Sequence, residues 1–253
     1  MVIRVILTIL SVFTLLSCGA CQPKTQNIQD LTYAKPKFPT KSFVQIYSGV
    51  NIKCSEGKKD RCRNGWHFFT GSGSVIARDV EGSLVLTAGH VCNASPPENI
   101  ATTLDTQIAV IDYLSRKWPS VVVHSVHKGA LDFCMLYVPH LELPEIPLSP
   151  RGLTPGDRVF NISAPGGRYH QPHPLLLEGL FSGNVYGGDS ALISIPSIGG
   201  VSGSAILNSD MQVVGIVYAT NLEFRFETLG TSYNNTLLFL QKALKMYINN
   251  KIK

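Results

Sequence analysis

Three short segments of the chain contain residue types that together can activate a nucleophile. The sequence TAGH ends at His90, the sequence LDFCML has Asp132 as its second residue, and the sequence GVSGS has Ser202 at its centre. A serine hydroxyl is a weak nucleophile near neutral pH unless a base such as histidine takes its proton. A buried carboxylate orients that imidazole and stabilises the imidazolium that forms. The three segments therefore predict the catalytic triad of a serine hydrolase that works through an acyl-enzyme.

The order of these residues along the chain separates the families of serine hydrolase. In α/β-hydrolases the serine comes first and the histidine last, and the serine lies in a G-x-S-x-G turn. All seven histidines of this chain precede Ser202, and residue 204 is serine rather than glycine. The order histidine, aspartate, serine is that of chymotrypsin. Ser204 as nucleophile, and Asp105 or Asp112 as acid, are the alternatives, although neither of these aspartates begins a strand as Asp132 does.

The elements that must position these residues are expected to be β-strands. From Phe43 onward, short apolar runs alternate with Gly, Pro, Asn and Asp, a pattern typical of an all-β sandwich or barrel. A cluster of prolines in residues 139–155 marks the expected junction between two β units. One amphipathic helix is predicted over Thr236–Ile248, with Asn234 or Asn235 as its N-cap.

The motifs resemble those of chymotrypsin/trypsin-like serine endopeptidases, and most closely the compact bacterial high-temperature-requirement type. TAGH resembles the family's T-A-A-H, DFCML after Leu131 its D-x-A-L-L, and GVSGSA its G-x-S-G-G-P. Further matches are GSG at 71–73, PGDRV at 155–159 followed by APGG, and VVGIV at 213–217. The similarity covers about residues 43–220, and six weak motifs in the family's order make a strong match.

The resemblance implies two six-stranded antiparallel β-barrels, chymotrypsin-like, with the catalytic cleft between them and a C-terminal α-helix. His90 and Asp132 are then expected from the first barrel and Ser202 from the second, with the N–H groups of Gly200 and Ser202 as the oxyanion hole. We expect no C-terminal peptide-binding domain of the kind that high-temperature-requirement proteases carry, because only 51 residues follow Ser202. The expected boundaries are 1–20 for a signal peptide, 21–42 for a tether, 43–143 and 144–232 for the barrels, and 233–253 for the helix.

The resemblance also implies where specificity resides. The pocket residues expected from it are Pro196, Tyr218, Ala219 and Thr220. Because none of them is acidic, we expect small or medium apolar residues rather than Arg or Lys at the cleavage position, unless Glu223 or Glu227 folds inward. The residue before Ser202 is Val201, where the trypsin branch has an aspartate, so we expect no activation by insertion of a new N-terminus.

Four cysteines of the body are placed for disulfide bonds. Cys54 and Cys62 bracket a short polar segment, and Cys92 and Cys134 each lie two residues after an expected triad member. If those triad members meet, their neighbouring cysteines meet too, and an exported compartment permits both bonds. We therefore favour the pairs 54–62 and 92–134. Buried free thiols are the alternative for the second pair.

The first residues are typical of an export signal. Arg4 precedes the apolar run Val5–Leu16, which is shorter than the roughly 20 residues of a membrane span. The sequence LLSC ending at Cys18 resembles a bacterial lipobox, so we expect a lipidated, membrane-anchored protein in the periplasm or outside the cell. Ordinary cleavage after Ala20 is the alternative.

The charge and the remaining histidines favour no other partner. The formal net charge of +5 comes from scattered residues that are not interleaved with aromatics, which is atypical of nucleic-acid binding. His124 and His127 form an H-x-x-H pattern that lacks a third ligand, so we expect no metal and no cofactor. The expected partner is a polypeptide substrate. A second hypothesis is a catalytically inactive trypsin-like fold that acts as a binding module, and a third is a protease dedicated to itself or to one partner.

Overall fold

The computed structural model describes residues 37–57, 62–94, 96 and 99–251. The expected signal peptide, most of the expected tether and Cys18 therefore lie outside the described residues. Within the described ranges, no helix combines the length and apolar character that a bilayer crossing requires.

The fold is mostly β, as the short apolar runs predict. The strands of the first half are β1 Phe43–Cys54, β2 Gly65–Arg78, β3 Gly82–Thr87, β4 Ala101–Asp112, β5 Lys117–Pro119, β6 Val121–Lys128 and β7 Leu131–Pro139. Those of the second half are β8 Arg158–Ser163, β9 Leu175–Val185, β10 Ser190–Ile193, β11 Ala205–Leu207, β12 Val213–Thr220 and β13 Thr228–Thr231. The helices are α1 Gly89–Cys92, α2 Tyr233–Lys251 and the short 3-10 turns η2 Thr40–Ser42, η3 Pro165–Gly167 and η4 Tyr186–Gly188.

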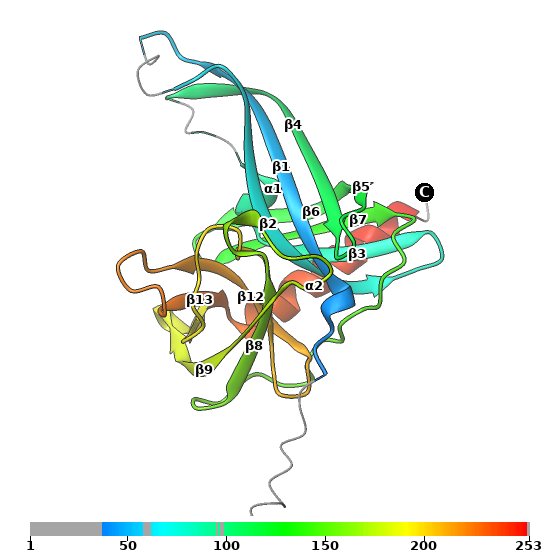
Figure 1. The fold of residues 1–253 in the computed structure, drawn as a ribbon, viewed down its shortest axis with the longest axis vertical. Coiled ribbons are helices and arrows are strands. Elements are labelled where there is room, and N and C mark those ends of the chain that lie inside the picture. The colour runs from blue at the N-terminus through cyan, green and yellow to red at the C-terminus, as the bar shows by residue number, and fades with distance from the viewer. Residues whose placement is uncertain (1–36, 58–61, 95, 97–98, 252–253) are drawn as a thin grey trace, which may run out of the picture. The chain divides into compact units, whose positions relative to one another are not determined.

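The strands form two antiparallel sheets, which confirms the chymotrypsin-like architecture (Figure 1). The second sheet is a closed barrel in the order β10-β13-β12-β11-β8-β9. The first is a seven-stranded sheet in the order β5-β4-β1-β2-β3-β7-β6, so it curls without closing, and it has one strand more than expected. Register shifts in its β2–β3 and β6–β7 pairs bend the sheet, as β-bulges do.

The apolar interior consists of one large cluster, which runs from the first sheet into β8, β11, β12 and α2, and of a smaller cluster inside the second sheet. β3, which leads to His90, is buried along its whole length, and β7 has five consecutive buried residues from Asp132 to Leu136. The first core includes the fully buried Phe43, Ile46, Leu86, Phe133 and Met135. The second includes Val159, Phe181, Ile193, Ile206 and Val217. The continuous cores fix the strand ends from which the site residues emerge.

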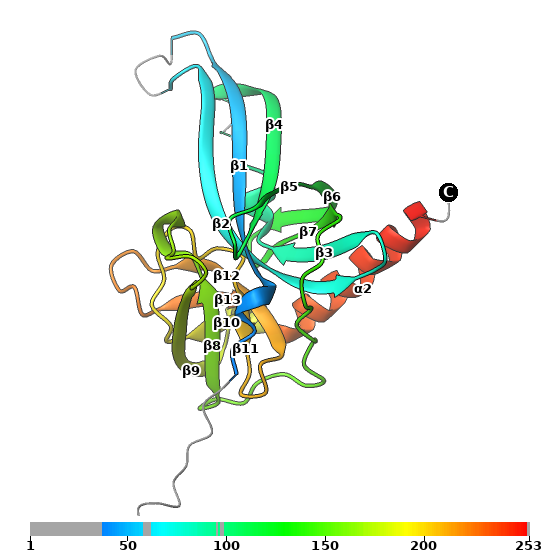
Figure 2. The ribbon, with the colours of Figure 1, turned by 45° about the vertical axis from the view of Figure 1, so that its right-hand side comes forward.

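Strands β1, β2 and β4 extend beyond the body of the molecule as an arm (Figures 1 and 2). Along it β1 pairs with β2 from Phe43↔Ser74 to Ile52↔Gly65. The disulfide Cys54–Cys62 joins the last residue of β1 to the segment that precedes β2. Val50 and Ile52 are buried on the arm and form a small apolar cluster with Ala101. The arm is therefore a packed structural element.

Helix α2 is longer than the sequence predicts, and its N-cap differs. It begins at Tyr233, and the hydroxyl of Ser232 accepts a hydrogen bond of 3.4 Å from the N–H of Asn235. The expected asparagine caps are therefore wrong, because the side chain of Asn235 instead donates to the carbonyl of Asp189. Phe239 stacks on Phe133 of β7 and docks the helix on the first sheet.

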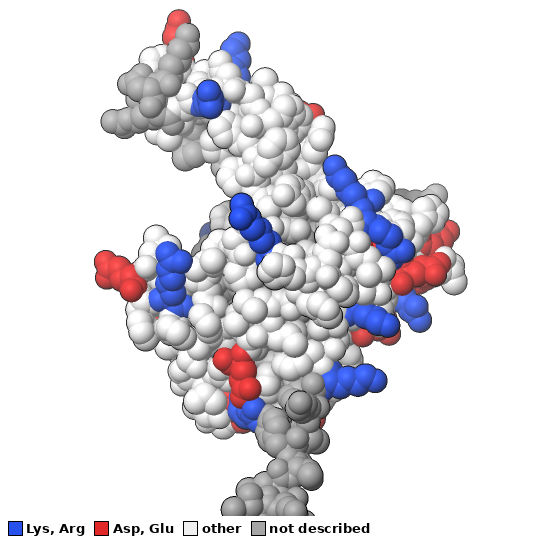
Figure 3. Space-filling view, in the orientation of Figure 1, with Lys and Arg blue, Asp and Glu red and all other residues white. Residues whose placement is uncertain are grey.

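The last turn of α2 is tied to the β2–β3 turn. The ammonium of Lys251 lies 2.5 Å from Asp79 and 2.7 Å from Glu81. A cation near the C-terminus of a helix also interacts favourably with the helix dipole. Acidic and basic side chains are dispersed over the face seen in Figure 3, in line with the scattered charge of the sequence.

Candidate active site

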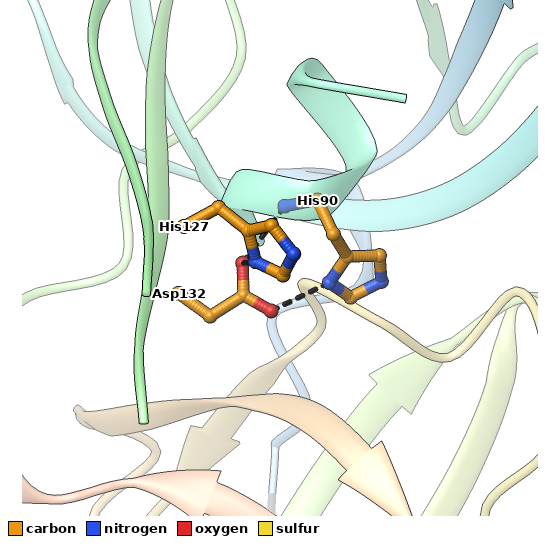
Figure 4. A group of neighbouring side chains, drawn as sticks. All are labelled: His90, His127 and Asp132. Atoms are coloured by element: carbon orange, nitrogen blue, oxygen red, sulfur yellow. Dashed lines mark hydrogen bonds and ion pairs between the residues drawn. The ribbon is translucent and has the colours of Figure 1, made fainter. Parts of the chain in front are cut away.

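His90 and Asp132 are held together by two hydrogen bonds (Figure 4). His90 lies in α1, directly after β3, and Asp132 is the second residue of β7. The imidazole Nδ1 is 2.6 Å from Asp132 Oδ2, and the backbone N–H of His90 donates to Oδ1 at 2.7 Å. Two contacts to one carboxylate fix both the position of α1 and the orientation of the ring. This is the arrangement that a general base requires.

A disulfide bond joins the same two elements. Cys92 in α1 is bonded to Cys134 in β7, and Cys54 to Cys62 in the arm. These are the pairings favoured from the sequence, and free thiols at Cys92 and Cys134 are excluded. In the chain-entropy account, a cross-link across 42 residues stabilises the fold by about 4 kcal/mol. The disulfide Cys92–Cys134 and the hydrogen-bonded pair of His90 and Asp132 therefore join the same two elements, α1 and β7.

His127 also binds Asp132, which sequence reasoning missed. It lies on β6 directly opposite Asp132 in the β6–β7 register, and its Nδ1 is 3.2 Å from Oδ1. The rings of His90 and His127 are 5.8 Å apart between centroids. His124, its neighbour in the H-x-x-H pattern, instead stacks on Phe239. This contact depends on the pairing of β6 with β7, which the spacing of residues along the chain does not reveal.

Asp132 remains ionised although it is buried. Its side chain is 2% exposed, whereas those of His90 and His127 are 34% and 50% exposed. Burial alone would raise the pKa of this carboxyl, but the hydrogen bonds and charge of His90, together with the charge of His127, outweigh it and hold the pKa below its usual value. An ionised Asp132 is the form that stabilises a protonated imidazole.

Ser202 lies in the loop between β10 and β11 and is anchored to the first sheet. The backbone N–H of Ser72 in β2 donates to the carbonyl of Ser202 at 2.8 Å. Gly203 has a φ of +86°, and a Cβ there would lie 2.1 Å from Thr87 Oγ1, so only glycine allows this approach. Within the described ranges, no hydrogen bond joins Ser202 Oγ to His90. Proton transfer from Ser202 to His90 therefore requires the two side chains to approach when a substrate binds.

The loop before Ser202 presents two unpaired N–H groups. The carbonyl of Gly199 accepts from Gly166 and that of Val201 from Ser204, at 2.7 and 3.0 Å. Because a trans peptide directs its N–H opposite to its C=O, the N–H groups of Gly200 and Ser202 point away from these partners. Neither group donates to another described residue. Free backbone N–H groups near the nucleophile are what an oxyanion hole requires.

The side chain of Ser72 supports this loop, a role that sequence reasoning missed. Its hydroxyl donates to the carbonyl of Gly200 at 2.7 Å and accepts from the N–H of Ala164 at 3.0 Å. Gly200 has a φ of +93°, and a Cβ there would lie 2.5 Å from the carbonyl oxygen of Ala164. In the sequence, Ser72 stands out only as the centre of a G-S-G motif.

His90 and Ser202 line one cavity of about 800 Å³. Its other walls are mostly apolar and come partly from the arm. They include Val50, Ile52, Phe69, Val91 and Ile198. His127 also lines it, as do the backbone groups of Gly199 and Gly200.

The expected pocket residues Pro196, Tyr218, Ala219 and Thr220 do not line this cavity. The hydroxyl of Tyr218 is 2.7 Å from that of Ser190, and burial raises its pKa. Glu227 is held by the side-chain amide of Asn221 at 2.9 Å. The cavity therefore extends from Ser202 on the side formed by the arm and α1, and the expected specificity residues remain a prediction.

Comparison with known proteins agrees with this fold. The structure is similar to that of the serine endoprotease from Yersinia pestis (20% identity, TM-score 0.60, 82% of this chain covered). It is also similar to the active form of the Rv3671c protease from M. tuberculosis (20% identity, TM-score 0.60, 81% of this chain and 82% of that chain covered). A third similar structure is that of the HtrA-type protease AlgW with a decapeptide (18% identity, TM-score 0.63, 82% of this chain and 64% of that chain covered).

The chain spans 64% of the length of the Yersinia pestis protein. A comparison with curated proteins found no match. The sequence profile of the trypsin-like peptidase domain matches residues 71–216, a segment that contains His90, Asp132 and Ser202. The chain therefore belongs to the trypsin-like peptidase family.

Proposed function

We propose that this protein is a serine endopeptidase that cleaves polypeptides with His90, Asp132 and Ser202. The observation that carries the proposal is the hydrogen-bonded pair of His90 and Asp132 at 2.6 Å, placed in the cavity that Ser202 also lines. Membership of the trypsin-like peptidase family supports the same activity. We also propose that the protein is exported and anchored to a membrane by a lipid on Cys18.

In the proposed reaction, Ser202 Oγ attacks the peptide carbonyl carbon while Nε2 of His90 takes its proton. The developing oxyanion accepts hydrogen bonds from the N–H groups of Gly200 and Ser202. His90 then returns the proton to the leaving amine, which departs and leaves an acyl-enzyme on Ser202. A water molecule, activated by the same imidazole, hydrolyses the ester and regenerates the serine. Asp132 stays ionised throughout and stabilises the imidazolium.

Active-site labelling tests the proposal directly. Purified protein is treated with a fluorophosphonate probe, digested, and mapped by mass spectrometry. We expect stoichiometric modification of the peptide that contains Ser202, because the probe reacts only with an activated serine. Labelling of another residue would overturn the assignment of the nucleophile. A folded protein that takes up no label would favour the binding module instead.

Gly200→Ala is expected to lower kcat by about 10²–10³-fold, the usual cost of losing one oxyanion donor. The added Cβ would collide with the carbonyl oxygen of Ala164, and the positive φ adds about 1–3 kcal/mol of strain. The loop must therefore shift and carry its N–H away. The measurement is kcat on a peptide substrate together with the free energy of unfolding.

Gly199→Ala is the matched control, because a Cβ at Gly199 has no neighbour within 4 Å. Its effect on kcat should be much smaller than that of Gly200→Ala. Equal losses in the two variants would contradict the oxyanion role of Gly200.

A further inference from the structure

We propose that His90, His127 and Asp132 form a binding site for a divalent transition metal of the zinc class, and that the bound metal reversibly inhibits the enzyme. The inhibitory part rests on the proposed function, whereas metal binding itself does not. The three side chains face one another in Figure 4. This departs from the sequence, whose H-x-x-H pattern offered no third ligand.

The donor atoms are close enough to share one ion. A ligand atom from each of the three residues lies within 4.8 Å of the other two. Zinc takes nitrogen and carboxylate ligands at about 2.0–2.2 Å, so neighbouring ligands in a tetrahedral site are roughly 3.3–3.5 Å apart. His127 Nδ1 and Asp132 Oδ1 already have a separation of 3.2 Å. His90 Nδ1 instead faces the other oxygen of the carboxylate, Oδ2, at 2.6 Å. The carboxylate must therefore bind the ion through both oxygens or turn to place one of them between the rings, and the His90 pair must open by roughly 0.7–0.9 Å.

The surroundings also suit a metal site. Two imidazoles and one carboxylate select zinc, copper or nickel over calcium or magnesium, which prefer oxygen ligands. His90 and His127 both line the cavity, so an ion can enter from solvent and keep one position open for water. The backbone N–H of His90 binds Asp132 at 2.7 Å and would orient the carboxylate, as outer partners of metal ligands do.

Metal binding at this place would remove the general base. As a base, neutral His90 carries its proton on Nδ1, which faces Asp132, and its free electron pair on Nε2. A metal on Nδ1 uses the electron pair of that nitrogen, so the one ring proton moves to Nε2. An imidazole protonated on Nε2 cannot take the proton of Ser202. No oxidation, reduction or covalent change of the protein is involved, and removal of the metal restores the original tautomer.

The binding step is tested on the full-length chain with Ser202→Ala, in which no activity is needed. Isothermal titration with zinc chloride should show one site. Adding His127→Gln should weaken binding at least ~10-fold, since even outer partners of a metal contribute that much. His124→Gln is the matched control, because His124 lies on the same strand but stacks on Phe239. An unchanged affinity in the His127 variant, or an equal loss in the His124 variant, would overturn the proposal.

The inhibitory step is tested on the protein with Ser202 intact. Zinc should suppress fluorophosphonate labelling in the concentration range of the calorimetric site, and EDTA should restore it. His127→Gln should shift the inhibitory concentration upward by the same factor as the affinity. Binding without suppressed labelling would overturn the inhibition. If the metal-free protein takes up no label at all, the proposed function fails, while the titration still decides the metal site.

Discussion

Ser202→Ala is expected to lower kcat by about 10⁶-fold, which is the loss seen when the nucleophile of a serine protease is removed. The remaining rate would come from the oxyanion donors and substrate binding. Because Ser202 Oγ makes no hydrogen bond within the described residues, the free energy of unfolding should change by no more than about 0.5 kcal/mol. The measurement is kcat on a peptide that the unaltered protein cleaves, with a denaturant titration of both proteins. A variant that retains its activity would refute the triad.

Ser204→Ala is the control for this experiment. Ser204 is buried, and its hydroxyl accepts a hydrogen bond of 2.7 Å from the side chain of Asn161. Its removal leaves the buried amide with one partner fewer, so the free energy of unfolding should fall by about 1–3 kcal/mol. The activity should survive, because the hydroxyl that the mechanism uses is still present. A loss of labelling in this variant, with labelling kept in Ser202→Ala, would make Ser204 the nucleophile.

Asp132→Asn is expected to lower kcat by about 10⁴-fold. The amide keeps the shape of the carboxyl group but loses the charge that stabilises the imidazolium, and it no longer selects the tautomer with the proton on Nδ1. The kinetic measurement is kcat across a pH series near neutrality. A loss of less than tenfold would show that Asp132 does not orient the base.

The same substitution should also change how stability depends on pH. The pKa of Asp132 is lower in the folded than in the unfolded protein, so its contribution is present above about pH 4 and is lost as the pH falls through the folded pKa. The free energy of unfolding of the unaltered protein should therefore fall more steeply in acid than that of Asp132→Asn. Denaturant titrations at neutral and acidic pH measure the difference.

Asp112→Asn provides a matched control for the kinetic effect. Asp112 is buried, as Asp132 is, and its carboxylate accepts hydrogen bonds from the side chains of Arg116 and Trp118. It has no part in the proposed mechanism. Its replacement should destabilise the fold because it breaks a buried network. It should leave kcat within a few-fold of the unaltered value. A 10⁴-fold loss here would return Asp112, an alternative acid in the sequence, to consideration.

Much of the fold could be predicted because short motifs carry strict local geometry. The order of His90, Asp132 and Ser202 excluded the α/β-hydrolases, and the expected contact of His90 with Asp132 implied the meeting of Cys92 and Cys134. Glycine is required at positions 200 and 203 because the backbone there has a positive φ and lies close to another segment. Such constraints are local in sequence, so a single chain reveals them.

Other features depend on register and packing, which a single sequence does not display. The contact of His127 with Asp132 follows from a register shift between Val122 and His124 that no residue pattern announces. The cap of α2 is another such feature, because Ser232, Asn234 and Asn235 all suit the position by residue type. The side chain of Asn235 instead donates to the carbonyl of Asp189, a contact that the sequence does not display. The open first sheet and the apolar wall from the arm arise in the same way, from contacts between distant strands.

The hydrogen bonds of Ser72 have a consequence for how the molecule assembles. One residue of the first sheet binds the carbonyls of Gly200 and Ser202 and the N–H of Ala164, all from the second half. The loop with the nucleophile can therefore reach its final conformation only after the two halves have docked. Docking of the two halves and completion of the active site therefore occur in one cooperative step. A partly assembled chain is expected to have no proteolytic activity toward the proteins around it.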